Sequence, residues 1–126
     1  MKGIYILIIK IKKPEKVKIG KLGIIDFKKG IYAYIGSAQN NLEKRIERHL
    51  KKSSDKKFHW HIDYLLNNKN IKIIDIKFKE LSKKYECLTA KKLLKNNIPI
   101  NGFGCSDCRC ISHLIKINKN KKFKIN

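Results

Sequence analysis

Several soft metal ligands gather near the end of the chain. Cys105, Cys108 and Cys110 are followed by His113 in the order Cys-x-x-Cys-x-Cys-x-x-His, and Cys87 precedes them. A tetrahedral Zn²⁺ needs four such ligands. Cys108, Cys110 and His113 could supply three of them, with Cys87 or Cys105 as the fourth. The alternative is a tight loop of reduced cysteines that pack as small apolar side chains. In a cytosolic chain, these cysteines argue against disulfides.

A second group of chemically capable side chains is spread along the chain. Tyr5 and Tyr34 lie in two apolar, strand-like runs. Arg45 and His49 are four residues apart, so on a helix they project from one face. Glu86 falls in the first turn of a later predicted helix. Each has an ordinary interpretation as well: half-buried strand aromatics, a solvated helix face, and a carboxylate that complements the helix dipole.

Three predicted strands carry the tyrosines. Residues 4–11 are apolar and β-branched, which predicts a strand buried on both faces, and Pro14 ends it. Alternation over residues 17–24 predicts a second strand with a glycine bend. Residues 31–35 predict a third. The short connections favour antiparallel hairpins.

Helical patterns follow. Leu42, Ile46 and Leu50 recur at i, i+4 and i+8, which predicts an apolar helix stripe after an N-cap at Asn40 or Asn41. The remaining predicted elements are a helix over 59–66, a strand over 71–78, a helix capped by Ser82 with Cys87, Ala90, Leu93 and Leu94 facing the core, and a strand over 111–117.

This order of elements predicts an α+β fold with a small antiparallel β-sheet. We expect a three-stranded core plus an enlarged hairpin over residues 16–29, flanked by about three helices. The 126 residues suit one domain over 1–117, followed by a basic, flexible tail over 118–126.

The charge balance indicates a polyanionic partner. The chain has 31 basic and 10 acidic residues, a net charge of +21, and 42% apolar residues, which is too many for a disordered tail. DNA is the expected partner and RNA the alternative. The longest uncharged apolar run covers only residues 3–9, so no membrane association is expected. The first residues lack a signal-peptide pattern, which favours a cytoplasmic protein.

The ordered motifs resemble the GIY-YIG nuclease family, and further motifs resemble its Uri-type endonuclease branch. The family words are Gly3-Ile4-Tyr5, Tyr34-Ile35-Gly36-Ser37-Ala38, Leu42-Glu43-Lys44-Arg45 with His49, and the late Glu86. The branch words are Trp60-His61-Ile62-Asp63-Tyr64-Leu65, Gly102-Phe103-Gly104, Ser106-Asp107-Cys108, Cys110 and His113-Leu114.

The resemblance implies a metal-dependent endonuclease that hydrolyses phosphodiester bonds in DNA. Tyr5 or Tyr34 would act as general base on water or orient it. Arg45 or the metal would have to favour the phenolate, since free tyrosine has a pKa of about 10. Arg45 would also grip the scissile phosphate, and His49 would relay a proton or contact phosphate. Glu86 would bind Mg²⁺, or Mn²⁺ in its place.

The resemblance also adds His61 as a catalytic residue, with a packing histidine as the alternative. The residues expected to contact nucleic acid are Ser37, Lys44, Arg48, Lys51 and Lys52. Substrate specificity would come from loops, a homodimer or a partner protein. Two other classes of function remain open: a non-catalytic basic module that binds DNA or RNA, and a zinc-dependent structural or adaptor protein.

Overall fold

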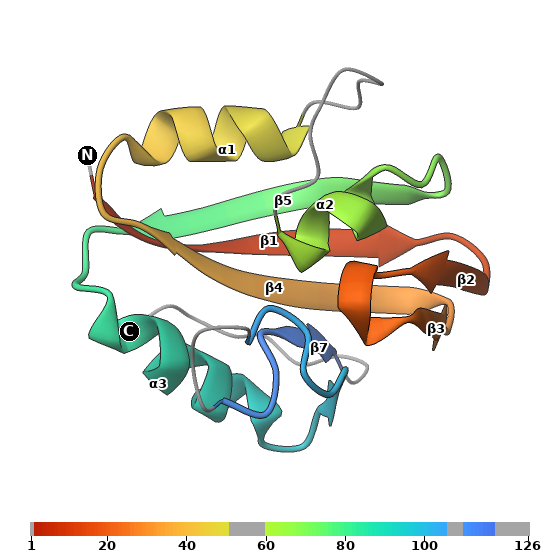
Figure 1. Ribbon diagram of the computed structural model, residues 1–126. Helices are drawn as coiled ribbons and strands as arrows, with labels where there is room; N and C mark the ends of the chain where they lie inside the picture. Colours follow the sequence, from red (N-terminus) through yellow and green to blue (C-terminus); the bar gives the residue numbers. More distant parts are fainter. Residues whose placement is uncertain (1, 51–59, 106–109, 118–126) are drawn as a thin grey trace.

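The fold is described by a computed structural model that covers residues 2–50, 60–105 and 110–117. Its elements, in chain order (Figure 1), are β1 (Gly3–Ile11), β2 (Glu15–Lys18), the 3₁₀ turn η1 (Gly20–Leu22), β3 (Ile24–Phe27), β4 (Gly30–Ala38), α1 (Leu42–Leu50), α2 (His61–Leu66), β5 (Ile71–Lys79), α3 (Lys84–Leu94), β6 (Ile98–Pro99) and β7 (Leu114–Lys116). The predicted basic tail, residues 118–126, lies outside the described residues.

The α+β class is confirmed, but the three-stranded core is wrong. Across the described residues, the main sheet has five antiparallel strands in the order β5-β1-β4-β7-β6. Of these five strands, β6 is the one that the sequence did not predict. It is a two-residue edge strand that pairs with β7. Pro99 lies in β6, where an edge strand tolerates proline although proline has no N–H to donate. The sequence indicated Pro99 only as the end of the preceding helix.

The enlarged hairpin is present, but residues 17–24 do not form one bent strand. They turn back through η1, so that β2 and β3 pair as a separate two-stranded sheet. Gly20 and Gly23 have φ values of +45° and +82°. Such angles favour glycine and allow the chain to reverse rather than merely bend.

Both faces of β1 are buried, as its composition predicts. Tyr5, Leu7 and Ile9 point into a core shared with α1, α2 and the β2–β3 hairpin. Ile6 and Ile8 point into a second core closed by α3. Successive side chains of β1 therefore point to opposite faces of the sheet and pack into two separate cores. Figure 1 shows the outcome: α1 and α3 lie on opposite sides of the sheet.

The buried face of α1 differs from the predicted stripe. Asn41 caps the helix, since its Oδ1 accepts the Lys44 N–H at 3.3 Å. Leu42 and His49 are buried, whereas Leu50 is 53% exposed. Leu42 and His49 are seven residues apart, which keeps them on one helix face as well as an eight-residue spacing would. The sequence favoured Leu50 only because it is apolar.

The later elements lie near their predicted positions. The second helix, third helix and last strand are α2, α3 and β7, and the strand over 71–78 is β5. Ser82 does not cap α3, which has Lys83 at its N-cap without a side-chain hydrogen bond. Ala90 and Leu93 are buried as expected, but Cys87 is only half-buried. None of the helices in the described ranges is long and apolar enough to cross a membrane.

Two alanine substitutions on α1 test its buried face. Leu42 is 1% exposed, so Leu42→Ala should lower the free energy of unfolding by about 2–5 kcal/mol. Leu50→Ala, the matched control, should change it by less than about 0.5 kcal/mol. Urea unfolding of both variants measures the difference. Equal losses would mean that the helix faces the core with the stripe expected from the sequence.

Candidate active site

A polar cavity of about 380 Å³ opens beside the β1–β4 pair. Five of the predicted site residues line it: Tyr5, Tyr34, Ser37, Arg45 and Glu86. Its other lining residues are Gly36, Gln39, Asn40, Trp60, Lys83 and Gly104. Five segments that are separate in the sequence thus meet at one cavity.

Tyr5 is fixed by the register of the sheet. It pairs with Gly36 across β1 and β4, and a Cβ at position 36 would overlap its ring. The ring therefore lies against the glycine, and only glycine is accommodated there. Its hydroxyl lies 2.7 Å from Nε2 of His49, a buried contact between β1 and α1. His49 does not line the cavity but contacts the hydroxyl of Tyr5, which does.

Arg45 connects α1 to the end of β4. Its Nη1 donates a hydrogen bond to the Ser37 carbonyl oxygen at 3.0 Å. Its guanidinium carbon lies 4.3 Å from the centre of the Trp60 ring, a cation–π contact. These two contacts hold a permanent positive charge at the cavity wall.

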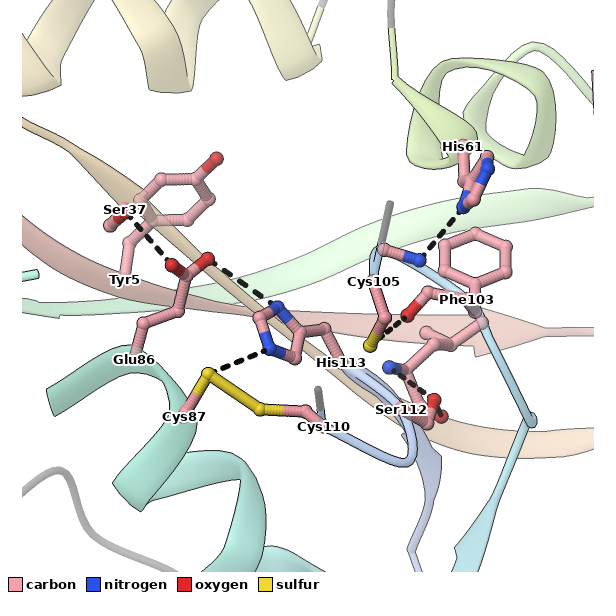
Figure 2. Close-up of polar contacts among 12 residues, drawn as sticks. Tyr5, Ser37, His61, Glu86, Cys87, Phe103, Cys105, Cys110, Ser112 and His113 are labelled. Atoms are coloured by element: carbon pink, nitrogen blue, oxygen red, sulfur yellow. Dashed lines mark hydrogen bonds and ion pairs between the residues drawn. A yellow bond between two sulfur atoms is a disulfide. The ribbon is translucent and has the colours of Figure 1, made fainter. Parts of the chain in front are cut away.

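Glu86 enters the cavity from the first turn of α3. Its Oε1 accepts the Ser37 hydroxyl at 3.1 Å, and its Oε2 lies 3.4 Å from His113 Nδ1. Figure 2 shows the carboxylate between these two partners, with Tyr5 nearby. Glu86 therefore has a fixed orientation rather than a free, solvated one.

His61 lies outside the cavity lining but contacts its rim. Its Nδ1 accepts the Gly104 N–H at 2.8 Å (Figure 2), so the neutral ring carries its proton on Nε2. Gly104 has φ of +75°, which favours glycine. Burial lowers the pKa of His61. These contacts support a positioning role for His61.

The predicted nucleic-acid contacts are only partly assembled at this site. Arg48 Nη1 donates a hydrogen bond at 2.7 Å to the fully buried Asp63 carboxylate. The Arg48 guanidinium therefore points toward α2, which contains Asp63. Its guanidinium carbon also lies 4.6 Å from the centre of the Trp60 ring. Lys44 is exposed on α1 and does not line the cavity. Lys51 and Lys52 lie outside the described residues.

The electrostatics do not favour a tyrosinate through the charge of Arg45 alone. Burial raises the pKa of Tyr5, and the Arg45 charge and hydrogen bond lower it by less. Burial also raises the pKa of Tyr34 well above its ordinary value, with Tyr5 and Glu86 adding to the rise. Both phenols therefore keep their protons at neutral pH, because desolvation of a charge outweighs one partly buried cation.

The cysteines lie behind Glu86. Of the five predicted soft ligands, Cys87, Cys110 and His113 come together, and the structure joins Cys87 to Cys110 in a disulfide. The expectation of reduced cysteines is not met at this pair. Cys105 lies outside the group of three, and its thiol donates to the Phe103 carbonyl oxygen at 3.5 Å. Cys108 lies outside the described residues.

Some cavity residues carried little sequence signal. Trp60 and Gly104 belong to the branch motifs, yet nothing in those motifs indicated a place beside Arg45 or His61. Lys83 is one lysine among many, so its place at the wall depends on where α3 begins. Asp63 looked like a helix residue, and its role emerges only from its bonds to Arg48 and to the Trp60 N–H.

The fold and the cavity together define an α+β protein with a partly cationic polar site at an antiparallel strand pair. Residues 4–126 match the family described as the domain of unknown function DUF123, and the chain belongs to that family. No curated protein and no solved structure matches it.

The lowered pKa of His61 predicts a pH-dependent stability. The unfolded chain protonates this histidine more readily, so stability should fall as the pH drops through about 6.5, the unfolded pKa. His61→Asn keeps an acceptor for the Gly104 N–H but cannot titrate. Urea unfolding between about pH 7.5 and about pH 5 should show a smaller loss in the variant. Parallel pH profiles would contradict this effect.

Proposed function

We propose that this protein is a GIY-YIG-type endonuclease that hydrolyses phosphodiester bonds in DNA. The observation that carries the proposal is the convergence of Tyr5, Tyr34, Arg45 and Glu86 on one cavity. The two tripeptide words that suggested the family lie on adjacent antiparallel strands, with Tyr5 opposite Gly36. This arrangement would give each of these four residues a physical task at the same place.

The cavity has the charge pattern that a phosphodiester requires. Arg45 and Lys83 line it as cations, and Glu86 is its carboxylate. A guanidinium offers paired N–H donors that match phosphate oxygens, and its fixed position reduces the cost of orienting it. The net charge of +21 favours a polyanion over a small neutral substrate.

Proton transfer would run through Tyr5 and His49. In the His49 tautomer that leaves Nε2 without a proton, the Tyr5 hydroxyl donates the hydrogen bond to Nε2. As a water attacks phosphorus and the ester P–O bond breaks, Tyr5 Oη would take the water proton while its own proton passes to His49, and the leaving oxygen would take a proton from solvent at the open cavity. This relay never leaves a buried phenolate, the state that burial disfavours most.

Glu86 suits a hard divalent cation such as Mg²⁺ or Mn²⁺. Mg²⁺ commonly takes one or two protein carboxylates and keeps several waters, so a single carboxylate on a polar cavity fits it. Ser37 adds a hydroxyl oxygen beside the same carboxylate. A bound Mg²⁺ would supply positive charge for the phosphate oxygens.

Substitutions at Arg45 and Glu86 test the proposal. Arg45→Ala and Glu86→Gln should each slow Mg²⁺-dependent nicking of a plasmid by about 100-fold or more, since each removes charge stabilisation. Lys91→Ala, which changes an exposed lysine on α3 outside the cavity, is the control and should nick at the wild-type rate. Gel-shift assays in EDTA should show DNA binding retained in all three.

The two classes of function give different results. Salt-sensitive binding without cleavage, under any divalent ion and on duplex, branched and single-stranded substrates, would favour the non-catalytic binding module for DNA or RNA. Unchanged nicking in Glu86→Gln would remove this carboxylate from the reaction.

The proposed relay makes a separate prediction. Tyr5→Phe keeps the ring against Gly36 but removes the hydroxyl, and His49→Phe removes the acceptor. Each should reduce single-turnover cleavage by about 100-fold or more. Because both act in one proton transfer, the double variant should be no slower than the slower single variant. Strictly additive losses would show that Tyr5 and His49 act independently.

A further inference from the structure

Three soft ligands from two distant segments meet on the far side of Glu86. Cys87 lies in α3, while Cys110 and His113 lie in the segment that leads into β7. Their ligand atoms are all within 4.8 Å of one another. Figure 2 shows the two sulfur atoms and the His113 ring facing each other. This group lies outside the lining of the polar cavity.

His113 is held in the orientation that a metal ligand needs. Its Nδ1 lies 3.4 Å from Glu86 Oε2, so Nε2 points to Cys87 Sγ at 3.7 Å. Its backbone is pinned as well: its N–H donates to the Phe103 carbonyl, and its carbonyl accepts the Ile35 N–H. Metal-binding histidines commonly have a carboxylate behind the second ring nitrogen, which fixes the tautomer and the ring. A disulfide alone makes no use of such an imidazole.

The spacing of Cys87 and His113 also fits a tetrahedral zinc ion, while the two sulfur atoms, which are bonded in the disulfide, would have to separate after reduction. With zinc bonds of about 2.3 Å to sulfur and about 2.0–2.1 Å to nitrogen, neighbouring ligand atoms lie about 3.6 Å apart. The distance from Cys87 Sγ to His113 Nε2 is 3.7 Å. The His113 side chain is only 3% exposed, so the group is shielded from bulk solvent on the imidazole side.

The geometry points to a Zn²⁺ site formed by Cys87, Cys110 and His113 when the two cysteines are thiols. A dithiol or phosphine reductant supplies the two electrons that open the disulfide, and two protons complete the thiols. When Zn²⁺ binds, both thiols release their protons to solvent, and His113 binds as neutral imidazole through Nε2. The fourth coordination position is filled from outside these three residues.

The proposed ion would join α3, through Cys87, to the segment that leads into β7, through Cys110 and His113. Since Glu86 directly precedes Cys87 and contacts His113, the ion would also fix the base of this carboxylate. The metal site does not depend on the nuclease proposal, because none of its three ligands lines the polar cavity. Glu86 links the two sites, since it lines the cavity and contacts His113.

Metal analysis of the untagged full chain tests this site. The chain is purified with a phosphine reductant and without chelator, and bound zinc is measured by inductively coupled plasma mass spectrometry. We expect about one Zn²⁺ per chain in the wild type. Cys87→Ser, Cys110→Ser and His113→Asn should each reduce the zinc content by at least about fivefold. Cys105→Ser, which changes a thiol outside the group, should retain it.

A second measurement avoids the risk that a variant fails to fold. Co²⁺ added to reduced wild-type chain should give the ligand-field bands of a tetrahedral ion and near-ultraviolet thiolate-to-cobalt absorption, and Zn²⁺ should abolish both. Disulfide-oxidised chain should give neither. Wild-type chain without zinc and without these bands would overturn the proposal. So would a Cys105→Ser variant that loses as much zinc as Cys87→Ser. Plasmid nicking is not used as a readout, so failure of the nuclease proposal leaves this result unaffected.

Discussion

The pairing of Tyr5 with Gly36 is the contact on which the rest of the site depends. Position 36 has no room for a Cβ, because the Tyr5 ring occupies that space. The ring can then lie over β4 with its hydroxyl against His49, which ties α1 to the sheet. A shift of one residue between β1 and β4 would turn Tyr5 toward the layer of α3. The strand register therefore fixes both the core and the cavity.

Burial determines which groups at this cavity can carry charge. Tyr5 and Tyr34 stay protonated because desolvation raises the pKa of each by more than Arg45 lowers it. Arg45 keeps its charge because it sits at the cavity wall between a carbonyl oxygen and an aromatic face. The lasting charges and the two neutral tyrosines thus share one cavity lining, while His49, the partner of Tyr5, lies outside it.

The sequence predicted what depends on local pattern and missed what depends on contacts between elements. The continuous apolar run of β1 was sufficient to predict burial on both faces. Leu50 fitted the helical period as well as His49, and only the acceptor role opposite Tyr5 explains why His49 is buried instead. Arg48 looked like one more cation for nucleic acid, but the buried Asp63 carboxylate holds it. Likewise, Cys87 was expected to pack in the core, whereas its partners Cys110 and His113 are supplied from beyond residue 105.

Glu86 lies where the two proposed sites meet, and this position carries a physical consequence. One carboxylate oxygen contacts Ser37 at the cavity, and the other contacts His113 beside the sulfur atoms. In a chain with 31 basic and 10 acidic residues, carboxylates that could hold a cation are scarce. A cation bound near one oxygen of the Glu86 carboxylate would weaken the attraction of that carboxylate for a cation near its other oxygen. Two thiolates beside His113 would offset this competition, since they bring their own negative charge to the zinc side. The soft ligands would thereby leave the Glu86 carboxylate available to the cavity.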